Sequence, residues 1–188
     1  MQPLEFLRAR RSTPSRLLAE PGPDDAQLRQ MLECAVRVPD HGNLTPWRLL
    51  LMRGHARLEL GDFIAGLSAR RRPEETKAIE KDRLRFSYAP LVIVVIASMH
   101  PAHKVPEQEQ LLSAGAVCLT LLQAADALGF GAQWLTGWAA YDAEVSARLG
   151  VQAPTERIVG FIHVGTARER IAERERPPLS ACVSEFSA

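Results

Sequence analysis

Apolar positions with helical spacing dominate the first part of the chain. Leu4 and Leu7 predict a short first helix that stops near Pro14, because the residue before a proline avoids helical geometry. Asp24 is a suitable N-cap for a second helix, which ends before Pro39. The apolar face of that helix consists of Leu28, Met31, Leu32, Ala35 and Val36. A loop is predicted over residues 39–46.

Four later segments have the composition of buried strands, namely 47–52, 91–97, 132–135 and 157–164. Residues 91–97 are apolar throughout and mostly β-branched, which is typical of a strand covered on both faces and predicts a central position. Between these strands, helices are predicted over 55–69, 107–128 and 142–149. The polar segment 70–85 is predicted to form a solvated helix or a mobile insert, and a charged tail begins at Gly165. This order predicts one domain, residues 1–188, of the α+β or α/β class.

The helix over 107–128 is apolar nearly all round in its second half, so it must be buried in the core or against a second subunit. Polar residues interrupt it, and the other strongly apolar run, 90–97, is too short to cross a bilayer. We therefore expect no membrane helix. The first eleven residues lack the apolar core of a secretory signal, which indicates a cytoplasmic protein.

Composition and charge narrow the class of protein. The chain has 188 residues, 46% of them hydrophobic, with 23 Lys and Arg against 22 Asp and Glu. A net charge of +1 gives no global field to attract nucleic acid or an anionic membrane, so any anion site must be a local cluster. Cys34, Cys118 and Cys182 lack paired metal-ligand spacing and are predicted to be buried, reduced thiols.

Most common catalytic motifs are missing from the sequence. We find no GxGxxG after a strand, no P-loop, no GxSxG and no HExxH. His100 and His103 have HxxH spacing, but Pro101 separates them and no third ligand is evident, so a pair of loop histidines is favoured over a metal site.

Arginines form the remaining candidate chemistry. The densest group is Arg8, Arg10, Arg11, Ser12 and Arg16. Guanidinium groups beside a hydroxyl suit a phosphate, although basic residues also complement the dipole at a helix end. A later group, Arg168, Arg170, Arg174 and Arg176, alternates with glutamates, as a solvated face does. The run 70–72 lacks interleaved aromatic residues for stacking bases, so a nucleic-acid site is not favoured.

The order of short motifs resembles the nitroreductase family of FMN-dependent oxidoreductases, in particular its short bacterial members, over nearly the whole chain. The matching pieces are Leu7 to Ser12, Arg37 to His41 leading to Pro46-Trp47, the strand after Ala89-Pro90, Ser113-Ala114-Gly115, Gly129-Phe130-Gly131 before Trp134, and Ile158 to Thr166. The resemblance implies a three-layer α+β fold with a mostly antiparallel sheet of four or five strands, in an interlocked homodimer.

The resemblance also implies a set of FMN-binding residues. Arg10, Arg11 and Ser12 would hold the phosphate, the ribityl chain and the pyrimidine edge. Arg37 and His41 would reach the flavin from the partner subunit, and Trp134, Leu135 and Thr136 would line the ring. Arg174 and Arg176 match the late basic pair near the phosphate. Pro14 stands where many relatives have Lys or Arg, which shifts phosphate neutralisation toward the late pair.

Because no dinucleotide fingerprint is present, the family's NAD(P)H donor would stack on the flavin only briefly and leave before the acceptor enters. This implies ping-pong reduction of nitroaromatics, quinones or similar small oxidants, with no catalytic side chain because FMN carries the chemistry. Two alternatives remain open, a flavin-binding carrier without efficient turnover and a specialised flavin enzyme of the same superfamily. No metal, nucleic-acid or membrane partner is expected.

Overall fold

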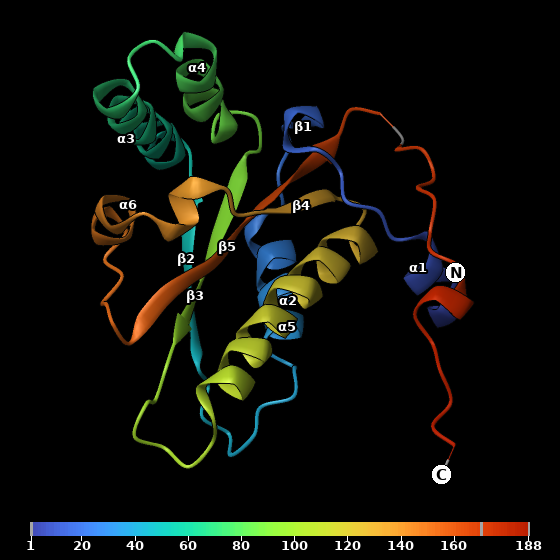
Figure 1. Ribbon diagram of the computed structural model, residues 1–188. Coiled ribbons are helices and arrows are strands. Elements are labelled where there is room, and N and C mark those ends of the chain that lie inside the picture. Colours follow the sequence, from blue (N-terminus) through green and yellow to red (C-terminus); the bar gives the residue numbers. More distant parts are fainter. Residues whose placement is uncertain (1, 170, 188) are drawn as a thin grey trace.

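The computed structural model describes residues 2–169 and 171–187, and it has three layers, with one sheet between two groups of helices (Figure 1). The strands are β1 (Leu18–Ala19), β2 (Trp47–Arg53), β3 (Leu91–Ser98), β4 (Gly131–Leu135) and β5 (Glu156–Ala167). They are ordered β1-β5-β3-β2, and β4 also pairs with β5. Every pairing is antiparallel, which confirms the predicted α+β class and sheet type.

Helices cover both faces of the sheet (Figure 1). The α-helices are α1 (Pro3–Ala9), α2 (Asp25–Ala35), α3 (His55–Arg71), α4 (Thr76–Arg85), α5 (Glu107–Ala127) and α6 (Ala143–Arg148). The short 3₁₀ turns are η1 (Ser15–Leu17), η2 (Trp138–Tyr141) and η3 (Leu179–Ala181). Residues of α2 and α5 form one core with the sheet, and residues of α3, η2 and α6 form the other.

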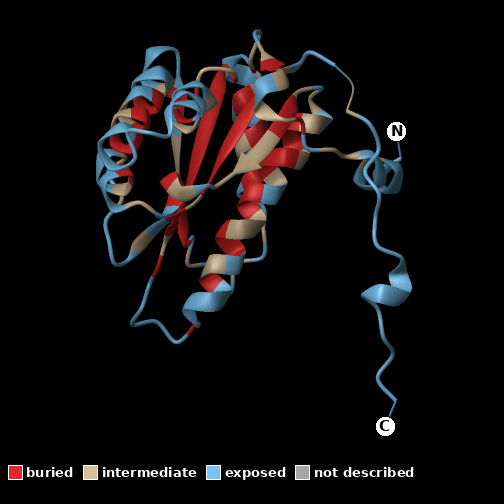
Figure 2. Ribbon diagram, turned by 45° about the horizontal axis from the view of Figure 1, so that its top comes forward, coloured by how far each residue is buried: buried red, intermediate tan, exposed pale blue. Residues whose placement is uncertain are grey.

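Strand β3 separates the two cores, as its composition predicts. Its alternate residues Leu91, Ile93 and Val95 face the α2 and α5 side, whereas Val92 and Val94 face the α3 side. All of β3 except its last residue is buried, and Figure 2 shows this strip at the centre of the molecule. Burial on both faces explains why the strand has no polar alternation.

Helix α5 is long and apolar enough to cross a membrane by length and composition alone, with half of its most apolar window buried inside the fold. In this structure its buried residues pack with β3 and α2, which agrees with a core helix. Its outer face still exposes Leu112 and Leu119.

Three predictions need correction, and one strand was not predicted. The segment 70–85 contains a mostly exposed helix, as one alternative predicted, but this helix is shorter than the segment, because residues 70 and 71 end α3 and α4 spans Thr76–Arg85. Strand β1 has only two residues, too few to produce a periodic signal. The charged tail begins later than predicted, because β5 continues past Gly165 to pair with β1. Cys34 and Cys182 are exposed rather than buried; only Cys118 is buried, which raises the pKa of its thiol to about 12.

Candidate functional site

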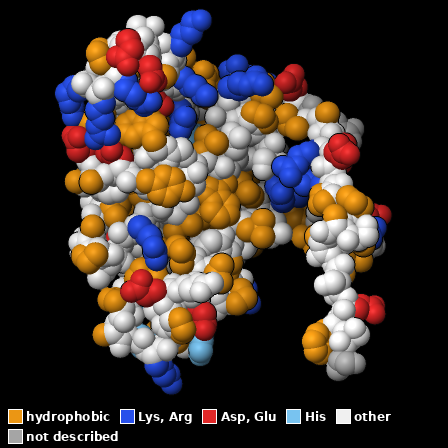
Figure 3. All heavy atoms as spheres, in the orientation of Figure 1, with side chains coloured by type: hydrophobic (Ala, Val, Ile, Leu, Met, Phe, Trp, Pro, Cys, Tyr) orange, Lys and Arg blue, Asp and Glu red, His pale blue; other side chains and the backbone are white. Residues whose placement is uncertain are grey.

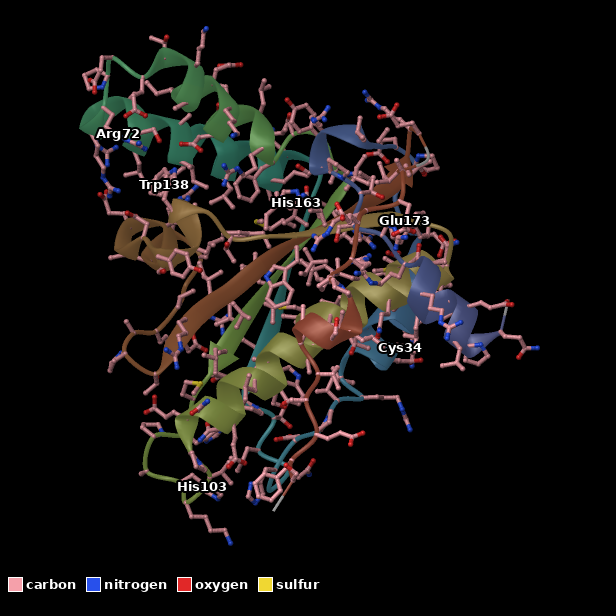
Figure 4. The ribbon with its side chains drawn as sticks, turned by 45° about the vertical axis from the view of Figure 1, so that its right-hand side comes forward. Cys34, Arg72, His103, Trp138, His163 and Glu173 are labelled. Atoms are coloured by element: carbon pink, nitrogen blue, oxygen red, sulfur yellow. The ribbon has the colours of Figure 1, made fainter. Side chains whose placement is uncertain are left out.

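Four of the predicted arginines come together where the segment after α1 meets the C-terminal tail. Burial and the charges of Arg176, Arg10 and Arg174 lower the pKa of Arg11, so the four guanidinium groups share one region. Figure 3 shows a compact group of basic side chains beside the tail, and Figure 4 places Glu173 of the tail next to the N-terminal segment. Arg170 of the predicted group lies outside the described residues. We call Arg10, Arg11, Arg174 and Arg176 the arginine cluster.

Within the arginine cluster, Arg10 and Arg11 differ in how well they are paired. Arg11 forms an ion pair with Glu173 and donates to the carbonyl oxygens of Arg8 at 3.2 Å and Arg10 at 2.9 Å. Nη1 of Arg10 is buried and has no hydrogen-bond partner among the described residues. A buried donor without an acceptor is costly, so Arg10 is the member best prepared to bind an anion.

The chain after the arginine cluster runs along β4. The N–H of Thr13 donates to the carbonyl of Ala132 at 2.9 Å, and the N–H of Ser15 donates to Oε1 of Gln133 at 2.6 Å. Gly131 permits this approach, because a Cβ there would lie 2.9 Å from Oγ1 of Thr13. The exposed Ser12 therefore lies between the arginine cluster and the beginning of β4.

A hollow of about 500 Å³ follows the end of β4. We call it the β4 hollow, and its lining residues are Pro14, Ser15, Arg16, Lys81, Arg85, Tyr88, Gln133, Trp134, Leu135, Thr136 and Gly137. Three predicted site residues, Trp134, Leu135 and Thr136, are thus brought together. The N–H groups of Thr136 and Gly137 donate to no other backbone group of the described chain, so they are free to bind a ligand.

The Trp134 indole lies across β5. Its Nε1 donates to the carbonyl of Val159 at 3.2 Å, and a Cβ on Gly160 would overlap the ring. Glycine at that position is therefore required for the observed ring placement. The indole also borders a second, larger hollow of about 770 Å³ on the α5 side, so it forms a partition between the two hollows.

Sequence reasoning missed Lys81, Arg85 and Tyr88, which α4 and the segment after it bring to the β4 hollow. Arg85 is the least exposed of the cations that line the hollow, with its side chain 20% exposed and Nη2 3.7 Å from Oδ1 of Asp82. Asp82 is itself buried and accepts from Oγ of Ser68 at 2.6 Å and Nε1 of Trp138 at 3.0 Å. Only the fold of α3 against α4 reveals this placement, because the segment 70–85 has no clear periodicity in sequence.

His163 lies on β5, opposite Gln133 of β4 in the strand register. Its ring is fully buried, and neither ring nitrogen has a hydrogen-bond partner among the described residues (Figure 4). Burial, followed by the charges of Arg85 and Arg57, lowers the pKa of His163 to about 3. The imidazole is therefore neutral near pH 7 and adds no charge beside Arg85.

His41 lies far from Arg10 of the same chain. Nδ1 of His41 is 2.7 Å from Oε2 of Glu109 near the start of α5, and Arg37 is exposed. Asp126, close enough to Arg10 to be influenced by its charge, lies near the end of that helix. Seventeen residues of α5 separate Glu109 from Asp126, or roughly 26 Å. One chain alone does not bring these two groups together.

Large apolar side chains are exposed on α5, on η2 and on the C-terminal tail. Leu112 of α5 is 65% exposed and Tyr141 is 78% exposed, both at the larger hollow. Helix α1 buries none of its residues, and Phe186 near the end of the extended tail is 95% exposed (Figure 2). An apolar surface of this extent is typical of an interface.

Comparison with known proteins identifies the family of this chain. The model of the nitroreductase family matches residues 7–166. The chain is 38% identical over 172 residues to the Escherichia coli K12 protein named "Putative NAD(P)H nitroreductase YdjA", covering 88% of each chain.

Two solved structures share the fold. A nitroreductase-like protein from Bacillus cereus has a TM-score of 0.86 at 23% identity, covering 100% of this chain and 97% of that one. A Desulfovibrio desulfuricans protein described as a "putative nitroreductase", solved in complex with FMN, has a TM-score of 0.77 at 22% identity, covering 100% of this chain and 99% of that one. Family, fold and enzyme class thus agree with the motif order in the sequence, and the chain belongs to the nitroreductase family of oxidoreductases.

Proposed function

We propose that this protein is an FMN-dependent oxidoreductase that uses NAD(P)H to reduce nitroaromatics, quinones or similar electron-poor acceptors in a ping-pong cycle. One observation carries the proposal: a buried, unpartnered arginine nitrogen lies at one end of β4, and a hollow with free backbone N–H groups lies at the other. The proposal also agrees with the NAD(P)H donor in the name of the E. coli relative and with FMN in the D. desulfuricans structure.

The residues present fit a flavin phosphate at the arginine cluster. Arg10 offers a buried donor that lacks an acceptor, and Arg174 and Arg176 add positive charge nearby. Ser12 supplies a hydroxyl from the next turn of chain. Charge-assisted bonds to phosphate are about twice as strong as neutral ones. This set would compensate for Pro14, which offers no side-chain donor.

The residues of the β4 hollow fit the ring of the flavin. When bound, FMN supplies a nitrogen that accepts hydride and passes reducing equivalents on. Trp134 and Leu135 provide apolar surface, and the N–H groups of Thr136 and Gly137 provide donors at its edge. Arg85 places a positive charge within the hollow, which stabilises the negative charge of a reduced ring. No side chain is needed as a nucleophile.

A homodimer would complete the site. His41 lies about one helix length from Arg10 of its own chain, which favours a second copy as the source of Arg37 and His41 at the flavin that this arginine binds. The exposed apolar residues of α1, α5 and the tail would be buried in that interface. We further propose the cytoplasm as the location, where Cys34 and Cys182 would remain reduced thiols.

The direct test is turnover by the purified protein loaded with FMN. We expect NADPH or NADH oxidation that depends on added menadione or nitrofurazone, with parallel lines in double-reciprocal plots, as a ping-pong cycle requires. Flavin binding without acceptor-dependent oxidation would contradict the enzyme and indicate a flavin carrier. A protein that binds no FMN at micromolar concentration would contradict the proposal as a whole.

A further inference from the structure

The cations of the β4 hollow divide into an inner one and two outer ones. Arg85 is half-buried and lies against Gly137, close to Asp82. Arg16 and Lys81 are exposed. They come from different elements, Arg16 from η1 and Lys81 from α4, and both line the hollow.

The hollow has no negative charge among its lining residues to balance these cations. Neither Arg16 nor Lys81 forms an ion pair with a described residue, whereas Arg83 on the same helix pairs with Asp62 at 3.0 Å and Glu80 at 3.5 Å. The whole chain has a net charge of only +1, so this local excess is not a consequence of composition. A cleft with like charges and low-dielectric walls concentrates ions of the opposite sign.

The hollow is large enough for a small-molecule ligand. Its volume of about 500 Å³ is within the range of small-molecule sites. A flavin ring along Trp134, Leu135 and Thr136, as in the proposed function, takes the inner end beside Arg85. Arg16 and Lys81 would then face a second ligand that enters over the ring.

We propose that Arg16 and Lys81 bind a phosphate group of the nicotinamide dinucleotide donor and thereby hold the donor over the flavin. This inference rests on the proposed function, since it assigns a substrate to the same site. The phosphate is either the 2′-phosphate that distinguishes NADPH from NADH or the pyrophosphate that both share. Binding by two exposed cations also explains how a donor could be held briefly and then released, without a dinucleotide-binding motif.

The test is calorimetric titration of the oxidised, FMN-loaded protein with NADP⁺ and NAD⁺, which bind without turnover. Arg16→Gln and Lys81→Gln are each expected to weaken NADP⁺ binding about 10-fold, and the double variant about 100-fold. Lys77→Gln is the matched control, because Lys77 is an exposed lysine of α4 that does not line the hollow. It should bind NADP⁺ as the unchanged protein does.

The second nucleotide identifies which phosphate is bound. An equal loss for NAD⁺ assigns Arg16 and Lys81 to the pyrophosphate, and a loss confined to NADP⁺ assigns them to the 2′-phosphate. Less than a twofold change for both nucleotides overturns the inference. A drop in FMN affinity in the same variants also overturns it, because the two cations would then belong to the flavin.

A separate titration distinguishes failure of this inference from failure of the proposed function. If the unchanged protein binds no FMN, the same variants are titrated with 2′,5′-ADP, which carries the 2′-phosphate and a 5′-phosphate in place of the pyrophosphate and needs no flavin ring. Weaker 2′,5′-ADP binding in Arg16→Gln and Lys81→Gln, but not in Lys77→Gln, would support the phosphate site even then. Equal binding by all variants would overturn it.

Discussion

Arginines occur in two regions of this molecule with opposite electrostatic surroundings. On the surface formed by α3 and α6, Arg70 and Arg71 pair with Glu144 at 2.9 and 2.8 Å, and Arg71 also pairs with Asp142. Along β4, Arg10 has an unpartnered buried nitrogen and Arg16 has no ion pair with a described residue. In Figure 3 basic and acidic side chains are interspersed over α3 and α4, while basic side chains gather together beside the tail.

The presence or absence of an acidic partner separates structural arginines from functional ones. A paired arginine on an exposed surface contributes a little to stability and is neutralised by its partner. An arginine without a partner contributes no such attraction and repels its neighbours. We therefore infer that Arg10 and Arg16 are balanced by a ligand, and that Arg70 and Arg71 of α3 are balanced by the protein.

The largest expected effect that tests this contrast is the loss of Arg10. Arg10→Ala should weaken FMN binding about 100-fold, because a charge-assisted contact to phosphate is removed, while the melting temperature of the FMN-free protein stays the same or rises. Flavin fluorescence titration and thermal unfolding measure the two quantities. Arg11→Ala should have a smaller effect on FMN affinity, since Arg11 is already paired with Glu173.

Unchanged FMN affinity in Arg10→Ala would contradict the role of the arginine cluster. A fall in the stability of the FMN-free protein would show instead that Arg10 is a structural residue like Arg71.

The next effect concerns His163, which lies near Arg57 of α3 and Arg85 of the β4 hollow. Its pKa is lowered from 6.5 to about 3, so between these values the unfolded chain takes up a proton that the folded chain does not. Stability is thus greatest above pH 6.5 and falls as the pH decreases, by up to about 1.4 kcal/mol per pH unit. Urea unfolding between pH 7 and 5 measures this, and a variant without the histidine separates it from carboxylates that begin to titrate near pH 5.

His163→Phe is the comparison variant, because it fills similar volume without a titrating group. Its stability should change much less over the same pH interval. An equal pH dependence in both proteins would mean that His163 is protonated in the folded state and that Arg85 has a cation beside it.

The smallest effect is expected on the paired surface. Arg71→Ala removes two ion pairs and a guanidinium 5.6 Å from the Trp138 ring, yet its side chain is 42% exposed and its interactions are screened. We expect the melting temperature to fall by no more than about 3 °C, with unchanged FMN affinity. A large loss of FMN affinity in Arg71→Ala would contradict the distinction between arginines that bind the ligand and arginines that pair within the protein.

Sequence reasoning predicted the elements that have a strong pattern. The apolar run in β3 and the long helix α5 were both visible, because burial on all sides removes polar residues. The capping of α2 was also visible, and Asp24 accepts from the N–H of Gln27 at 2.8 Å. Strand β1 was not, because pairing of its two residues with the end of β5 depends on tertiary contacts alone.

The candidate site was predictable only in part. Arg10 and Trp134 follow from the motif order, since they lie in segments that resemble the family. Lys81 and Arg85 could not be found in the same way, because their position in the β4 hollow depends on how α4 packs against α3. Likewise, no sequence pattern shows that Arg10 lacks a partner while Arg11 has one.

The central claim is that two copies of the chain share each flavin site, with the arginine cluster from one and Arg37 and His41 from the other. The most direct test is a heterodimer in which one chain carries Arg10→Ala and its partner carries both Arg37→Ala and His41→Ala. In this heterodimer a shared arrangement leaves one complete site and one doubly defective site. We predict one tightly bound FMN per heterodimer, although each parent homodimer binds FMN weakly. Weak binding in the heterodimer as well, or a protein that stays monomeric, would contradict the account.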